Sequence, residues 1–461
     1  MTGANLNMPT SYKMHLLPAA WLVAFAALSA APALKIGDVQ LLEVIQAARL
    51  ILVLLLFIAG GLKIPNRGLW REFGAKYAFF LFGCAVISIL ALRLPFFPPP
   101  DISILKRPFV LSASRICELF LVGYCMLAAA ESLRQEALQD SSKFRLVLDV
   151  YCGVALLSAL VSIAGFLLFE LTGISTPVIY GPESRVRGFF NEGGPYGMFL
   201  LSAILAWLLR SCLFGSPRRL IYWGAHCVML GALVASRSKV AAIAVLCLCL
   251  AGALFAGSRR QRFSLACVLS LVLALLIGAF GGKFLGYFYS YSNFDELLYY
   301  RPGDPSLIMG RVTGALILPR MAAAHPILGV GLGNYSLMRN DPAYLHDLPA
   351  VDGWDLPGMG LLGSTAELGI PLTLGFLAVL LLPLRQAWRR EASPLLVAVA
   401  VYQPVAFLLG VNLNFFYPWL MAAFALAAIY GPVSVPATAR SIRLATGNHV
   451  ACGRSDEKTR R

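Results

Sequence analysis

The chain has 461 residues, of which 59% are hydrophobic and only 13% are charged, and its formal net charge is +15. Soluble domains carry about 25% charged residues, so this composition excludes an ordinary soluble globular protein and indicates a membrane protein. The basic excess follows the predicted topology described below, so a nucleic-acid partner is not needed to explain it.

Apolar runs long enough to cross a bilayer recur along the chain. A span needs about 20 mostly apolar residues to cross roughly 30 Å of hydrocarbon. We therefore predict an all-α polytopic membrane protein with about twelve transmembrane helices. They are expected at 16–34, 41–62, 74–92, 109–130, 146–172, 194–214, 219–235, 240–256, 263–281, 358–383, 394–411 and 413–431. The first run also fits a cleaved signal peptide, but so many spans follow that an uncleaved span is favoured. The last two runs fit either a hairpin or one broken helix.

These runs divide the chain into five parts. A short tail (1–15) precedes the first nine spans (16–281), and one long loop (282–357) precedes the last three spans (358–431) and a basic tail (432–461). With the N-terminus in the cytoplasm, more than half of the 38 lysines and arginines fall on the cytoplasmic side. This is the positive-inside pattern, and it makes both tails cytoplasmic and the long loop external.

Arginines retained on the external side suggest an anionic ligand there. The stretch "RVRGFFNEGGPYG" begins with Arg185 and Arg187 and leads into a predicted span. A guanidinium presents two donors to two phosphate oxygens and keeps its charge at neutral pH. The competing interpretation is that these side chains only reach out to lipid headgroups.

A second basic stretch, "ASRSKVAAIA", places Arg237 and Lys239 between two predicted spans. Charge near the membrane is costly and usually has a functional partner. The alternative is a tight hairpin turn with an arginine that extends to the interface.

The third stretch, "GRVTGALILPRMAAAHPILGVGLGNYS" (310–336), lies in the long loop. The spacing of its apolar residues, with Arg311 on the polar side, predicts an amphipathic helix on the membrane surface. Pro326 is expected to end this helix. The glycines that follow predict a compact turn, because glycine tolerates positive φ and close backbone approach. They lack the GxGxxG spacing and the βαβ context of a dinucleotide-binding loop.

Histidine is the side chain best suited to acid–base chemistry at neutral pH. Two histidines, His325 and His346, lie in the long loop. Asn334 follows the glycines of that loop, and Glu367 in "AELGIPL" lies inside a predicted span, where a carboxylate is a functional candidate by default. No HExxH, GxSxG or Walker A motif is present in the sequence.

Taken together and in this order, "RVRGFFNEGGPYG", "ASRSKVAAIA", the 310–336 stretch and "AELGIPL" resemble the O-antigen ligase / O-antigen polymerase superfamily of bacterial inner-membrane proteins. The resemblance covers roughly 40–430. It implies an enzyme at the periplasmic face that uses a glycan carried by undecaprenyl diphosphate, with neither a nucleotide sugar nor a metal or other cofactor. Family members commonly carry a His-Asn pair shortly before the Glu of the last motif. This chain has no histidine there, and His346 lies earlier.

The resemblance implies that Arg187, Arg237 and Arg311, together with Arg185, hold the diphosphate. A loop histidine, His346 or His325, would be the base, with Glu367 and Asn334 in support. The expected partners are the lipid-linked oligosaccharide, a glycan acceptor, membrane lipids and a chain-length regulator.

Three functions remain open at this point. The leading one is a polymerase of lipid-linked oligosaccharide repeats of an O-antigen or exopolysaccharide. A ligase that transfers the glycan to lipid A-core or another acceptor would use the same donor. A transporter or flippase would also suit many spans, but it predicts internal repeats that we do not find in the sequence.

Overall fold

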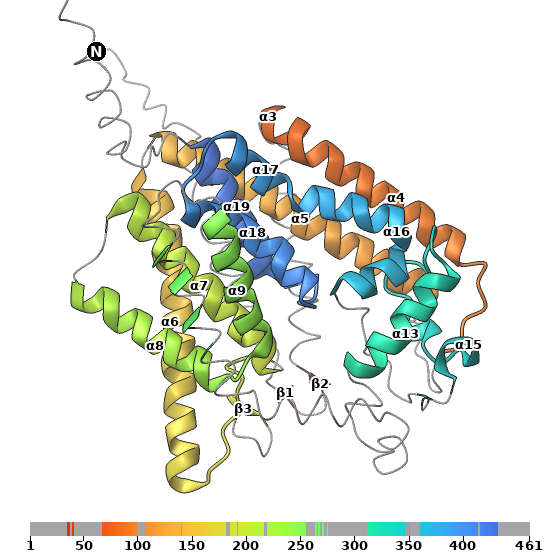
Figure 1. Cartoon of the computed structure of the whole chain (residues 1–461), viewed down its shortest axis with the longest axis horizontal. Coiled ribbons are helices and arrows are strands. Elements are labelled where there is room, and N and C mark those ends of the chain that lie inside the picture. Colours follow the sequence, from red (N-terminus) through yellow and green to blue (C-terminus); the bar gives the residue numbers. More distant parts are fainter. Residues whose placement is uncertain are drawn as a thin grey trace, which may run out of the picture.

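The computed structural model describes a helical protein (Figure 1). The described residues are 35–36, 39–40, 67–98, 107–139, 141–180, 185–190, 192–215, 219–254, single positions between 263 and 274, 311–346, 348, 350, 360–413 and 415–431. Their elements are β1 (Lys35–Ile36), β2 (Val39–Gln40), α3 (Arg67–Leu69), η1 (Trp70–Gly74), α4 (Ala75–Ala91), α5 (Pro108–Gln139), α6 (Ser141–Thr172), β3 (Ile179–Tyr180), β4 (Arg185–Val186), α7 (Gly193–Phe214), α8 (Arg219–Ala235), α9 (Lys239–Leu254), α13 (Arg311–Ala324), α14 (Tyr335–Met338), α15 (Pro342–Leu345), α16 (Gly360–Leu380), α17 (Leu382–Arg389), α18 (Pro394–Leu408) and α19 (Phe416–Tyr430).

Five described helices are long and apolar enough to cross a membrane: Trp70–Ala91, Pro108–Gln135, Phe144–Thr172, Gly193–Phe214 and Gly360–Leu380. Four shorter apolar helices accompany them, α8, α9, α18 and α19. These nine helices coincide with predicted spans, and the last two runs form separate helices that pack against each other. The predicted spans 16–34 and 41–62 lie outside the described residues, as does most of 263–281.

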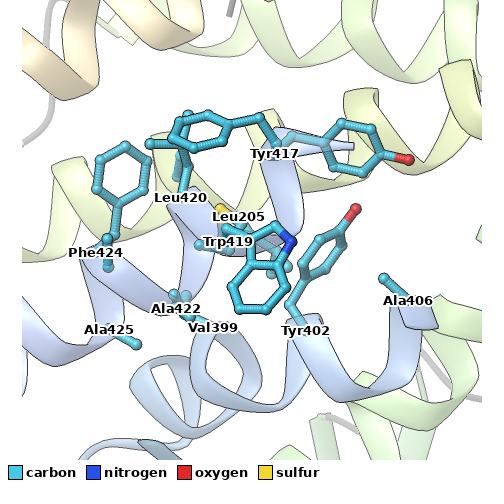
Figure 2. Close-up of a cluster of buried hydrophobic side chains, with 14 of the residues drawn as sticks. Leu205, Val399, Tyr402, Ala406, Tyr417, Trp419, Leu420, Ala422, Phe424 and Ala425 are labelled. Atoms are coloured by element: carbon cyan, nitrogen blue, oxygen red, sulfur yellow. The ribbon is translucent and has the colours of Figure 1, made fainter. Parts of the chain in front are cut away.

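The core is centred on α19. Nearly every side chain of this helix is buried, including Trp419 and Phe424 (Figure 2). The helix packs against α5, α18 and α7. Two buried tyrosines connect this centre to α7, because the Tyr402 hydroxyl donates to Met198 O at 2.5 Å and the Tyr417 hydroxyl donates to Pro195 O at 3.2 Å. Burial of so much aromatic surface makes α19 a main contributor to the core.

The periphery is apolar as well. Large hydrophobic side chains point outward from the candidate spans: Phe79 is 77% exposed, Phe82 is 66% exposed and Leu171 is 83% exposed. An apolar surface of this kind is unfavourable in water and favourable in lipid, as expected for a membrane protein.

Several helix ends and connections gather on one side of the helix bundle, which we call the site face. There the segment 92–98 after α4 meets α14, where Phe97 N donates to Leu337 O at 2.9 Å. The N-terminal ends of α7 and α19 also meet there. The opposite ends carry a set of basic residues: Arg134, Arg145, Arg210, Arg219, Arg385, Arg389 and Arg390. That distribution fits a cytoplasmic face, while the orientation itself stays a prediction.

Candidate functional site

The first candidate site is built on the short β3–β4 hairpin before α7. Its register pairs Ile179 with Val186 and Tyr180 with Arg185, which fixes the two arginines of the "RVR" motif at the end of α6. Arg187 extends the pairing, because its N–H donates to Val178 O at 2.8 Å and its Nε donates to Pro177 O at 3.0 Å. The Nε of Arg187 therefore helps to hold the hairpin in place.

The second basic motif forms the tight turn between α8 and α9. Arg237 has a φ of 48°, which is uncommon for a residue other than glycine, and its side chain is exposed. The serines on either side of it are buried. Ser238 accepts a bond from Ala241 N at 3.2 Å, as an N-cap does, and its hydroxyl donates to Gly194 O of α7 at 3.1 Å.

Both motifs meet at Gly193, the first residue of α7. A Cβ on Gly193 would lie 2.5 Å from Ser236 O, 3.0 Å from Val186 O and 3.3 Å from Arg185 Nη2. The hairpin, the α8–α9 turn and the start of α7 therefore approach so closely that only glycine fits. We call the group formed by Arg185, Arg187, Gly193 and Arg237 the arginine site.

Two features make the arginine site attractive to an anion. The first is the N-terminus of the long helix α7, where Glu192 is extended and gives no side-chain cap, so the partial positive charge of the helix end faces this group. The second is Arg185, whose Nε is buried and has no hydrogen-bond partner among the described residues. A buried guanidinium N–H without a partner is costly unless a ligand or water completes it.

The glycine run of the long loop forms a different structure. It docks on a break in α16, where Gly369 has a φ of 72° and a ψ of 167°. Backbone bonds join the two segments: Val330 N donates to Ala366 O at 2.9 Å, Gly331 N donates to Glu367 O at 2.9 Å, and Ile370 N donates to Pro326 O at 2.8 Å. The glycines therefore allow two backbones to pair at close range.

Glu367 stabilises this docking with its side chain. Its buried carboxylate accepts the N–H of Gly333 at 3.1 Å and the N–H of Tyr335 at 3.4 Å. Asn334 lies between them, fully buried, and its amide donates to Val330 O at 3.0 Å. The structure therefore gives both predicted supporting residues a role in shaping the loop, at the N-terminal end of α14.

The two predicted histidines lie on either side of the docked glycine loop, His325 after α13 and His346 at the end of α15. Nε2 of His325 hydrogen-bonds to the Tyr344 hydroxyl at 2.8 Å. Arg320 Nη1 donates to Tyr344 O at 2.9 Å, which holds α15 against α13. His346 ends α15 with a φ of 50° and is exposed. Arg320, His325, Tyr344 and His346 form what we call the histidine cluster.

Burial shifts the pKa of two side chains in this cluster. Partial burial lowers the pKa of His325, and the nearby Asp341 carboxylate opposes the shift. Burial also raises the pKa of the Tyr344 hydroxyl. At neutral pH the His325 imidazole is therefore neutral, which is the form that a general base requires.

The arginine site and the histidine cluster are built on different helices. The arginine site rests on α6 to α9, at the left of Figure 1, whereas the histidine cluster rests on α13, α15 and α16, at the right. The structure therefore groups Arg185, Arg187 and Arg237 and, separately, His325 and His346. Arg311 begins α13, and its side chain lies outside the described residues.

The helix predicted in the long loop corresponds to α13, Arg311–Ala324. Its apolar residues Ile317 and Met321 are fully buried against α14–α16. These side chains therefore pack on protein, because the docked loop supplies a partner surface that periodicity alone does not reveal.

Several residues of these sites carry no sequence signal of their own. Ser236 and Ser238 look like ordinary turn residues, and Tyr344 looks like one aromatic among many. In the folded chain their backbone or hydroxyl groups complete the two sites.

The described residues contain no group of three or more His, Cys, Asp or Glu side chains that could hold a metal ion. No protein-family model matches the chain, and no curated protein matches it either.

Proposed function

We propose that the chain is a membrane glycosyltransferase that joins oligosaccharide repeats carried on a lipid diphosphate, at the periplasmic face of the bacterial inner membrane. In this reaction an acceptor hydroxyl attacks the anomeric carbon of the donor glycan. The bond from that carbon to the diphosphate oxygen breaks, and the lipid diphosphate leaves with the bonding electrons. The hydroxyl proton passes to a base of the protein.

The arginine site is the observation that carries this proposal. A departing diphosphate gathers negative charge, and prepositioned cationic donors stabilise that charge without reorganisation. Arg185, with its buried Nε, the N-terminus of α7 and the exposed Arg237 supply such donors. The close packing around Gly193 holds the first two in place.

The histidine cluster supports the second half of the chemistry. His325 is held by Tyr344 and is neutral at physiological pH, and His346 is exposed. Both groups belong to connections on the site face, so a donor diphosphate and an acceptor hydroxyl would approach from the same side of the membrane. Because the attacking hydroxyl must reach the carbon that carries the diphosphate, this role requires the arginine site and the histidine cluster to face one reaction centre.

The test compares the wild type with Arg185→Gln and Arg237→Gln in the native host, at matched protein levels. Lipid-linked and surface glycans are separated on gels by chain length. Arg93→Gln is the matched control, because Arg93 is an exposed arginine at the site-face end of α4 and outside the arginine site.

A polymerase predicts that both site variants accumulate single lipid-linked repeats, while the control resembles the wild type. Accumulation of long lipid-linked chains without transfer would instead assign ligation. Unchanged glycans in both site variants would overturn the role of the arginine site and favour a transporter.

A further inference from the structure

The short helix α17 lies between a candidate membrane span and a second apolar helix. The candidate span α16 ends at Leu380, α17 covers Leu382–Arg389, and the apolar helix α18 begins at Pro394. Because α17 connects two apolar helices, it is confined to the ends of both. It lies on the side of the helix bundle opposite the site face, where the basic residues gather.

The two sides of α17 differ sharply. Leu382, Gln386 and Ala387 are buried against the protein. On the other side, Arg385, Trp388 and Arg389 are exposed, and their i, i+3 and i+4 spacing places them together on one helix face. Trp388 is 67% exposed, an unusual position for tryptophan in water but a common one at a membrane interface.

A polar cluster behind α17 fixes this orientation. The carboxylate of Glu72 accepts hydrogen bonds from Gln386 and from the Tyr430 hydroxyl. Arg390 lies over the Tyr430 ring at 4.3 Å and donates to Ile429 O at 2.8 Å. Glu72 and Arg390 therefore have partners within the protein, and the exposed Glu391 offsets only one of the exposed arginines of this segment.

The charge of that face is positive. The ion pairs found among the described residues include neither Arg385 nor Arg389. Through the Gln386–Glu72 bond, α17 also lies beside the start of η1 and α4, where Arg71 and Lys76 are exposed.

We propose that α17 is an interfacial helix that binds the headgroups of acidic phospholipids. Arg385 and Arg389 would each direct a guanidinium fork at a lipid phosphate, and Trp388 would lie at the headgroup level between them. The membrane-boundary position selects lipid over a soluble anion, and the cationic face complements an acidic leaflet. This inference uses neither the arginine site nor the histidine cluster, and it stands apart from the proposed function.

The experiment titrates the purified full-length chain in detergent with phosphatidylglycerol or with phosphatidylcholine, and native mass spectrometry measures the bound lipid. Each arginine near an acidic headgroup is expected to account for about a fivefold change in affinity. The Arg385→Gln/Arg389→Gln variant should therefore bind phosphatidylglycerol about 25-fold more weakly. Its affinity for phosphatidylcholine, whose phosphate is balanced by its own ammonium, should fall much less.

Arg93→Gln/Arg107→Gln is the matched control. It removes the same charge from two exposed arginines at the site-face ends of α4 and α5. Unchanged phosphatidylglycerol binding in the α17 variant, or an equal loss in the control, would overturn the proposal. If the double variant does not fold, Arg385→Gln and Arg389→Gln are measured singly, and the absence of a severalfold loss in both would overturn it.

Discussion

Gly369→Ala is the substitution that most directly tests how the glycine loop is held. The φ of 72° and ψ of 167° at Gly369 lie in a region that essentially only glycine occupies. A Cβ there would also lie 2.2 Å from Ile327 O and 2.5 Å from its carbonyl carbon. Both atoms belong to the backbone of the docked loop, so the clash cannot be relieved by rotating a side chain.

The cost can be worked out from these contacts. Backbone strain of this kind costs about 1–3 kcal/mol. To relieve the overlap, the loop must move away and give up the backbone bonds of Val330, Gly331 and Ile370, each contributing about 1 kcal/mol net. Together these terms predict that docking weakens by about 4–6 kcal/mol. A change of about 4 kcal/mol corresponds to a nearly thousand-fold shift in the docking equilibrium.

Hydrogen exchange measured by mass spectrometry on the purified protein checks this prediction. Peptides containing Val330 and Gly331 should exchange far faster in Gly369→Ala than in the wild type. Gly375→Ala is the control within the same helix, because a Cβ on Gly375 meets no heavy atom within 4 Å. Wild-type exchange in the Gly369 variant, or equal acceleration in the control, would refute the docking geometry described above.

Two further substitutions test the candidate sites. Gly193→Ala places a methyl group against Ser236 O and Arg185, so it should reduce glycan output at least as much as Arg185→Gln. Gly153→Ala is the control, because its Cβ meets open space, and it should leave glycan output unchanged. The same amount of glycan on gels from both glycine variants would count against the arginine site. The pKa of His325 is lower in the folded protein than in the unfolded chain. As the pH falls, the unfolded chain therefore takes up the proton first. The folded state loses stability from about pH 6.5 down to the lowered pKa of the folded protein. In His325→Gln this part of the pH dependence should be smaller in thermal unfolding scans, and an identical pH profile would contradict the assigned burial.

The sequence by itself determined where the described membrane helices lie. A bilayer demands a long apolar run in which every backbone group is bonded internally, and this requirement is local, so the run 194–214 predicts α7 without any tertiary information. The arginine-rich motifs could be recognised in the same way, because charge at a membrane boundary stands out in an apolar chain. The distribution of basic residues over the two ends of the helices also follows from sequence.

Only the tertiary structure decided which of these residues meet. Arg185 and the Ser236–Ser238 turn are distant in sequence, and they converge because Gly193 lets α7 approach both. Glu367 has the sequence signature of an intramembrane functional carboxylate, yet its oxygens accept backbone N–H groups of the docked loop. Such pairings depend on contacts between segments far apart in the chain, and neither periodicity nor composition contains that information.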